Sequence, residues 1–146
     1  MALAKRKGND FTDHLKTVPL FAACTKKELG LIAGVAREVS FPEGSVICKE
    51  GETGIGMHVV VEGETKVQIG GRTKRRLGPG AFFGEVAVLD GGPRTATVIA
   101  DTPVRTIAIA AWNLRTVLKN NPTLTLKMLE EICRRTRNST PSSQND

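Results

Sequence analysis

Apolar and polar residues alternate through the middle of the chain, a pattern typical of half-buried strands. The alternation is clearest in residues 65–69 and 105–109. Short β-favouring runs recur between glycine and proline residues, and the expected strands are residues 38–41, 45–49, 56–61, 65–69, 73–77, 96–100 and 104–110. Glu62-Gly63 and Gly70-Gly71 suit tight hairpins, because glycine readily adopts positive φ. Many short antiparallel strands predict a sandwich or rolled barrel over residues 37–110.

Helical patterns precede this β segment. A first helix is expected from about residue 10, and Pro19 would end it because proline cannot continue a helix. Thr25 and Glu28 have the spacing of a capping box, in which each side chain bonds the other residue's backbone N–H. This pair predicts a second helix over residues 26–36.

The apolar spacing changes to a helical period after the last strand. Trp112 and Leu118 belong to an expected short helix, in which Trp112 would pack against the barrel, and Pro122 follows its end. A last helix running to about Arg137 carries an apolar stripe of Leu124, Met128, Leu129 and Ile132. The expected organisation is one domain over residues 10–137, with disordered tails at residues 1–9 and 138–146.

Composition narrows the classes of function. The 146 residues carry a net charge of +6. The chain has no tyrosine and one tryptophan, so its basic clusters lack the interleaved aromatic side chains on which nucleic-acid bases stack. We therefore interpret the basic clusters as solvated surface. Cys24, Cys48 and Cys133 are too scattered for a disulfide framework or a zinc site. This use of cysteine makes a reducing cytoplasm the expected location. No apolar run in the sequence is long enough to span a membrane.

Residues 78–98 combine a glycine-flanked apolar turn with one carboxylate and one arginine. A short helix opening at Gly84 would direct free backbone N–H groups at an anion, and the missing Cβ would let a ligand approach the main chain. Arg94 can give a phosphate two parallel charge-assisted hydrogen bonds. Glu85 accepts hydrogen bonds when ionised, which suits a sugar hydroxyl. The segment therefore predicts a site for a sugar phosphate.

This segment resembles the phosphate-binding cassette of cyclic nucleotide-binding domains, the family of the catabolite activator protein, the regulatory subunits of protein kinase A and the cyclic nucleotide-gated channels. Residues 20–21, 28–29, 41–47, 50–54 and 57–63 resemble other parts of the family pattern, so that roughly residues 10–135 are covered. The resemblance implies a mainly β fold with flanking helices. Its centre would be an eight-stranded antiparallel β-roll (a double-stranded β-helix, jelly-roll-like) over residues 37–110, with N-terminal helices over 10–36, a short cassette helix, and two C-terminal helices over 111–137.

The resemblance also implies roles for the cassette residues. Arg94 would pair with the exocyclic phosphate oxygens, Glu85 would take the ribose 2′-hydroxyl, and a buried Glu85 beside Arg94 would also pair with it. The full ligand-binding set is Phe83, Gly84, Glu85, Val86, Ala87, Arg94, Thr95 and Ala96. The expected ligand is cAMP, with cGMP as an alternative, because family members with threonine at the position of Thr95 often accept both.

The last helix would fold over the base as a lid when ligand contacts reposition Val88 and Leu89. Its base-capping residue is left open among four candidates, because the helix register decides it: Met128, Leu129, Ile132 and Arg134. The same apolar stripe could instead form a homodimer.

The resemblance implies a non-catalytic sensor that regulates an attached or partner effector of unknown identity. A metal-dependent barrel enzyme would need a cluster of ligands, and His14 and His58 lie far apart, so no metal or cofactor is expected. A DNA-binding regulator would need a helix-turn-helix beyond the last barrel helix, and the sequence ends soon after Pro141, so no DNA binding by this chain is expected. A protein-interaction module with a vestigial nucleotide site is the alternative. A chain cut from a channel or transporter would lie at the cytoplasmic face of the membrane.

Overall fold

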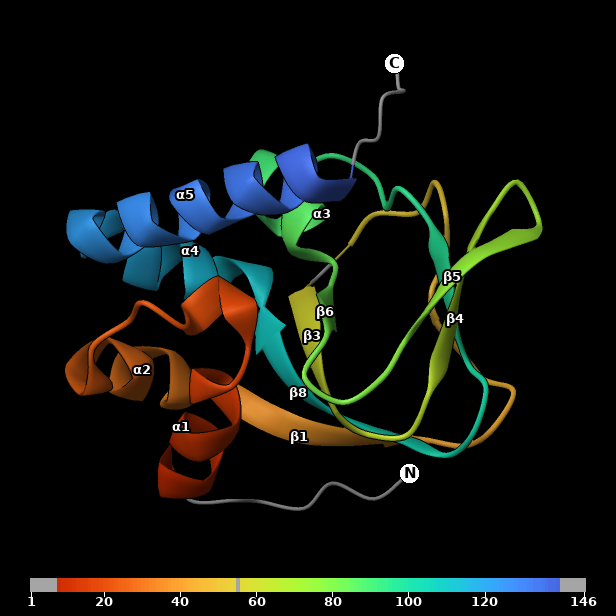
Figure 1. Ribbon diagram of the computed structural model, residues 1–146, viewed down its shortest axis with the longest axis horizontal. Coiled ribbons are helices and arrows are strands. Elements are labelled where there is room, and N and C mark those ends of the chain that lie inside the picture. The colour runs from red at the N-terminus through yellow and green to blue at the C-terminus, as the bar shows by residue number, and fades with distance from the viewer. Residues whose placement is uncertain (1–7, 55, 140–146) are drawn as a thin grey trace.

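The computed structural model describes residues 8–54 and 56–139. Two four-stranded antiparallel sheets form a roll, and the helices gather on one side of it (Figure 1). The helices are α1 (Gly8–Lys16), the 3₁₀ turn η1 (Pro19–Phe21), α2 (Lys26–Ala33), α3 (Glu85–Asp90), α4 (Ala111–Lys119) and α5 (Pro122–Ser139). The strands are β1 (Ala36–Phe41), β2 (Val46–Cys48), β3 (Gly56–Glu62), β4 (Thr65–Ile69), β5 (Arg72–Leu77), β6 (Phe82–Phe83), β7 (Thr97–Ala100) and β8 (Val104–Ala110). The predicted eight-stranded β-roll with flanking helices is confirmed.

The strand order is β1-β8-β3-β6 in the first sheet and β2-β7-β4-β5 in the second. In the first sheet Met57 lies opposite Ile109 and His58 lies opposite Ala108. Because successive side chains of a strand point to opposite faces, Met57 faces the helices and His58 faces the inside of the roll. The register therefore separates a helix-side core from the roll interior.

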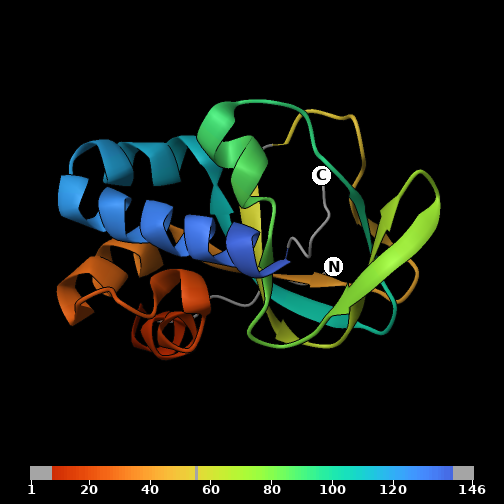
Figure 2. The same ribbon diagram turned by 45° about the horizontal axis from the view of Figure 1, so that its top comes forward.

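The larger core lies between the first sheet and the helices. It contains the fully buried side chains Leu15, Phe21, Leu29, Ile32, Met57, Ile107, Ile109, Leu114, Leu124 and Met128. Leu124 and Met128 lie four positions apart on α5, so they share one face of that helix and anchor it. Figure 2 shows α5 running alongside α4, with its C-terminal end near the roll. A smaller cluster inside the roll contains Cys48, Val60, Val67, Phe83 and Val98.

The predicted capping box of α2 is confirmed. Glu28 N donates to Thr25 Oγ1 at 3.1 Å, and Thr25 N donates to Glu28 Oε1 at 2.8 Å. The predicted extension of this helix to residue 36 is wrong, because Ala36 already pairs with Ile109 as the first residue of β1. Residues 1–7 and 140–146 of the expected tails lie outside the described residues, whereas residues 8–9 and 138–139, expected to be disordered, belong to α1 and α5.

The short strand β6 was not among the strands predicted from the sequence. The predicted positive φ is confirmed at Gly63 (95°), Gly70 (61°) and Gly71 (81°), and Gly70-Gly71 form the hairpin of β4 and β5. The predicted hairpin at Glu62-Gly63 is wrong, because β3 and β4 belong to different sheets and the turn leads from one sheet to the other. The prediction that Trp112 packs α4 against the roll is wrong: its side chain is 66% exposed, and Leu114 fills the buried position instead. Tryptophan at the first turn of α4 simply falls on the outward face of the helix.

Candidate functional site

Gly84 connects β6 to the cassette helix α3 in a conformation that favours glycine. Its φ is 90° and its ψ is 0°, which lies in the left-handed region. A Cβ at this position would lie 2.4 Å from Nη1 of Arg94 and 2.9 Å from the carbonyl oxygen of Gly56. The missing side chain therefore lets Arg94 pack directly against the start of α3.

The backbone of Arg94 is held by the loop before β3. Arg94 N donates to the carbonyl of Glu52 at 2.8 Å, and Gly51 N donates to the carbonyl of Arg94 at 2.9 Å. The side chain is only 8% exposed, and its Nη1 donates a long hydrogen bond of 3.4 Å to the carbonyl of Gly84. Among the described residues Arg94 forms no ion pair. A buried guanidinium without a counter-charge is costly, and an anionic ligand would offset that cost.

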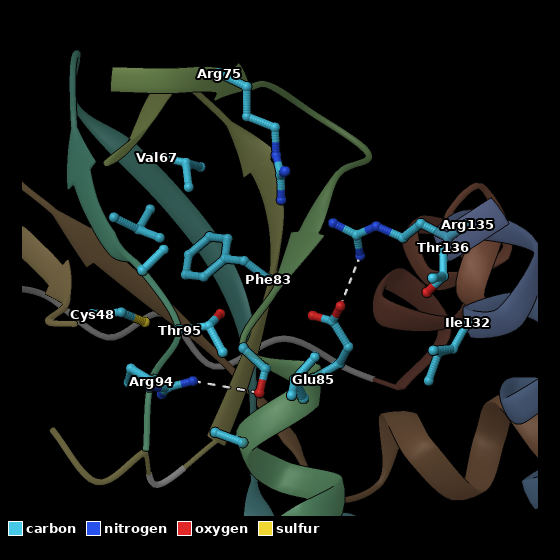
Figure 3. Close-up of a pocket in the computed structure, with 15 residues that line it drawn as sticks. Cys48, Val67, Arg75, Phe83, Glu85, Arg94, Thr95, Ile132, Arg135 and Thr136 are labelled. Carbon is cyan, nitrogen blue, oxygen red and sulfur yellow. Dashed lines mark hydrogen bonds and ion pairs between the residues drawn. The ribbon is translucent and has the colours of Figure 1, made fainter. Parts of the chain in front are cut away.

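Glu85 is also 8% exposed, and it pairs with a distant helix. Its Oε2 accepts a hydrogen bond of 2.9 Å from Nη1 of Arg135 on α5 (Figure 3). The same guanidinium lies 4.3 Å from the centre of the Phe82 ring, a cation–π contact. The prediction that Glu85 pairs with Arg94 is therefore wrong for the described residues, since the ion pair that Glu85 forms is with Arg135.

The cassette and the end of α5 enclose a cavity of about 210 Å³. All eight residues of the predicted ligand-binding set line it, and Arg75 of β5 and Arg135 of α5 also extend toward it (Figure 3). The lining contains three guanidinium groups, those of Arg75, Arg94 and Arg135, and the single carboxylate of Glu85. Its charge therefore suits an anion that also carries a hydrogen-bond donor for Glu85.

The four base-capping candidates separate clearly. Ile132 lines the cavity. Met128 is 2% exposed in the helix-side core, Leu129 is 54% exposed, and Arg134 is exposed and pairs with Glu131. Leu129 consequently does not belong to the buried part of the predicted stripe.

Sequence reasoning missed six lining residues: Cys48, Val67, Arg75, Val98, Arg135 and Thr136. Helical spacing could have indicated one of them, because Arg135 follows Ile132 by three positions and so shares its face. Arg75 and Val67 are opposite each other in the β4–β5 ladder, so the strand register would have been needed to place them. Of these residues, Cys48, Arg135 and Thr136 come from segments far from the cassette in sequence.

His58 lies behind the cassette, inside the roll. Its ring stacks on Phe83 with centroids 5.1 Å apart, and its Nδ1 lies 2.9 Å from Oγ1 of Thr106. Burial, with smaller contributions from the charges of Arg94 and Arg37, lowers the pKa of His58 to about 4. The sequence indicated no partner for this histidine. In the structure its neutral ring stacks on Phe83 and so supports a residue that lines the cavity.

Two other features bear on the kind of site. Within residues 8–54 and 56–139 no group of three or more histidine, cysteine, aspartate or glutamate side chains is placed to hold a metal ion. None of the described helices has both the length and the apolar character needed to cross a membrane.

Comparison with known proteins agrees with this geometry. The chain is 39% identical over 105 residues to a cyclic nucleotide-gated potassium channel of Mesorhizobium japonicum, covering 72% of this chain and 29% of the channel. It resembles the crystal structure of the Thermus thermophilus catabolite activator protein with a TM-score of 0.73 and 27% identity, covering 83% of this chain and 59% of that one. The N-terminal domain of a Streptomyces coelicolor transcriptional regulator gives a TM-score of 0.74 and 30% identity, covering 92% of this chain and 99% of that one.

The chain spans less than a third of the length of the channel it matches. Residues 38–121, more than half of the chain, match the family model described as the cyclic nucleotide-binding domain. This match contains most of β1, all of β2 to β8 and the whole cassette. The chain therefore belongs to the cyclic nucleotide-binding domain family.

Proposed function

We propose that this chain is a non-catalytic sensor that binds a 3′,5′-cyclic nucleotide, cAMP or alternatively cGMP, in the cavity beside α3. The observation that carries the proposal is the Arg94 guanidinium, which is 8% exposed and forms no ion pair with a described residue. A cyclic phosphate carries one negative charge and two exocyclic oxygens. It would supply the missing counter-charge and accept two parallel hydrogen bonds from Arg94.

The cassette helix would complete the ligand's polar contacts. The backbone N–H groups of Val86 and Ala87 lie in the first turn of α3, where N–H groups have no partner within the helix. They would donate to the phosphate. Glu85 would accept a hydrogen bond from the ribose 2′-hydroxyl, which a phosphate oxygen cannot give.

Helix α5 would act as the lid, with Ile132 and Arg135 contacting the nucleotide's base. Arg135 already donates a hydrogen bond to Glu85. The cavity of about 210 Å³ is also smaller than the roughly 300–1,000 Å³ of typical ligand sites. Entry of the nucleotide therefore requires the end of α5 to move and Arg135 to release Glu85. The ligand shifts this equilibrium only by its different affinity for the two arrangements.

The output of such a movement would lie outside the cavity. The names of the relatives include a potassium channel and a transcriptional regulator, so an attached or partner effector in the cytoplasm, or at the cytoplasmic face of a membrane, is part of the proposal. Leu126 and Leu129 are 56% and 54% exposed on the outer side of α5, and this apolar surface favours contact with an effector or a second copy.

Isothermal titration calorimetry with cAMP and cGMP tests the proposal. The wild-type chain is compared with Arg94→Gln and with Arg72→Gln, which removes an exposed arginine of β5 outside the cavity. We expect wild type and Arg72→Gln to bind alike and Arg94→Gln to lose about tenfold or more in affinity. Equal binding by Arg94→Gln, or no binding of either nucleotide by the wild type, would contradict the proposal and favour a protein-interaction module.

A further inference from the structure

A second cavity lies beside Arg94, between the first sheet and the start of α4. Its volume is about 450 Å³, against about 210 Å³ for the cavity beside α3, and it falls in the usual size range of small-molecule sites. Strands β1, β2 and β8 supply apolar walls, which include Val39, Phe41, Ile47 and Ala108. Such walls suit the apolar body of a ligand.

The charged side chains that line this second cavity are all positive among the described residues. Arg37 and Arg94 line it, and no aspartate or glutamate does so among the described residues. Arg37 is exposed and forms no ion pair with another described residue. His58 lines the same cavity, and after burial the charges of both arginines contribute to lowering its pKa. The positive potential is therefore concentrated near His58, with no carboxylate in the cavity wall to oppose it.

The two cavities share one wall. Arg94 lines both of them, and His58 in the second cavity stacks on Phe83, which lines the first. The Arg94 side chain is thus within reach of an anion from either side. An anion on one side competes with an anion on the other for the same guanidinium.

We propose that the second cavity binds a small amphipathic carboxylate, whose charged group lies between Arg37 and Arg94 and whose apolar body packs against Phe41, Ile47 and Ala108, and that its binding weakens cyclic nucleotide binding. The ligand class follows from the lining, which combines apolar walls with two cations. The coupling between the cavities rests on the proposed nucleotide function, whereas binding of the carboxylate itself does not.

Trp112 provides a direct readout of this cavity. It lines the cavity, is 66% exposed, and is the one tryptophan of a chain without tyrosine. Titration with octanoate, followed by fluorescence, is the test. We expect a saturable blue shift of the Trp112 emission, because the apolar body would cover the indole ring. Octan-1-ol, which has the same chain length but no charge, should bind about tenfold more weakly or worse.

Variants locate the site. Ala108→Phe places a large side chain in the cavity, and Arg37→Gln removes an exposed cation without altering the core. Each should weaken octanoate binding by about tenfold or more, whereas Arg72→Gln on β5 should leave it unchanged. Circular dichroism melting of each variant serves as the folding control. Unchanged octanoate binding in folded Arg37→Gln would overturn the proposal, as would the absence of a saturable shift in the wild type.

The coupling is measured by titrating cAMP with and without saturating octanoate. We expect octanoate to weaken cAMP binding by roughly fivefold or more, and cAMP to weaken octanoate binding by the same factor, because linkage is reciprocal. Independent binding of the two ligands would contradict the sharing of Arg94. Octanoate binding in a chain that binds no nucleotide would support the second cavity while contradicting the proposed function, so the two failures are distinguishable.

Discussion

Arg135 of α5 donates a hydrogen bond of 2.9 Å to Glu85 of α3, across 50 positions of sequence. This contact joins the last helix to the cassette and occupies the carboxylate that we propose for the ribose. The lid and the ligand therefore compete for one acceptor. In a sensor built this way, nucleotide binding and movement of α5 are linked through Glu85.

A double-mutant cycle with Glu85→Gln and Arg135→Gln measures this link. The pair is partly buried, so we expect a coupling of about 1 kcal/mol in the free energy of unfolding without nucleotide. Saturating cAMP should abolish the coupling, because the ribose then takes Glu85. Urea denaturation of the four proteins, with and without cAMP, provides the numbers. A coupling that cAMP leaves unchanged would mean that Arg135 never releases Glu85.

Gly84 can be tested against a glycine at the other end of the same helix. Gly84→Ala and Gly91→Ala both place alanine at positive φ, 90° and 73°, at an expected cost of about 1–2 kcal/mol each. Only at Gly84 does the added Cβ meet Arg94 Nη1, at 2.4 Å, whereas it meets nothing within 4 Å at Gly91.

Gly84→Ala should therefore also weaken cAMP binding by roughly 10- to 100-fold, the loss expected for charge-assisted hydrogen bonds worth about 1.5–3 kcal/mol. Gly91→Ala should bind cAMP as wild type does. Calorimetric titration of both variants checks this, and equal affinities would mean that the position of Arg94 does not matter for binding.

The sequence predicted the local parts of this molecule better than its long-range pairings. The capping box of Thr25 and the hairpin of Gly70-Gly71 depend on neighbours within a few positions, and both are confirmed. The hairpin predicted at Gly63 is wrong, because the partners of β3 and β4 are distant strands. The partner of Glu85 lies on α5, whose register is fixed by burial of Leu124 and Met128. Helical spacing puts Arg135 on the same face as Ile132, but no local pattern shows which face of α5 turns toward the cassette, and Arg135 was therefore missed.

Arg75 gives a prediction about the base. It lines the cavity from β5, and an arginine can donate two hydrogen bonds to O6 and N7 of guanine, worth about 1–3 kcal/mol, whereas adenine presents an amino donor at the corresponding position. Arg75→Ala should weaken cGMP binding by roughly 5- to 100-fold and cAMP binding much less. Lys74→Ala, the next position of β5 and outside the cavity lining, is the matched control. Competition binding with both nucleotides provides the measurement, and an equal loss for both would rule out a role in base selection.

His58 predicts a loss of stability in acid. Its pKa is lowered from 6.5 to about 4 in the folded chain, so protonation disfavours the folded state. The contribution of neutral His58 to the free energy of unfolding is fully present above about pH 6.5 and is lost as the pH falls through about 4. The total loss is on the order of 3 kcal/mol, because each unit of pKa shift corresponds to 1.36 kcal/mol. Denaturation between pH 7.5 and 4 should show a shallower pH dependence in His58→Gln than in wild type. Parallel curves would show that the histidine is not buried in its neutral form.

Calorimetric titration of the wild-type chain with cAMP, 5′-AMP and adenosine tests the central claim most directly, because the three ligands share the adenine and differ in the phosphate that Arg94 would bind. We predict saturable binding of one cAMP per chain, with adenosine weaker by at least about tenfold for want of the charge-assisted hydrogen bonds to Arg94, and 5′-AMP also weaker because its phosphate is not held in the ring. Adenosine binding as tight as that of cAMP, or no saturable heat with cAMP, would contradict the account.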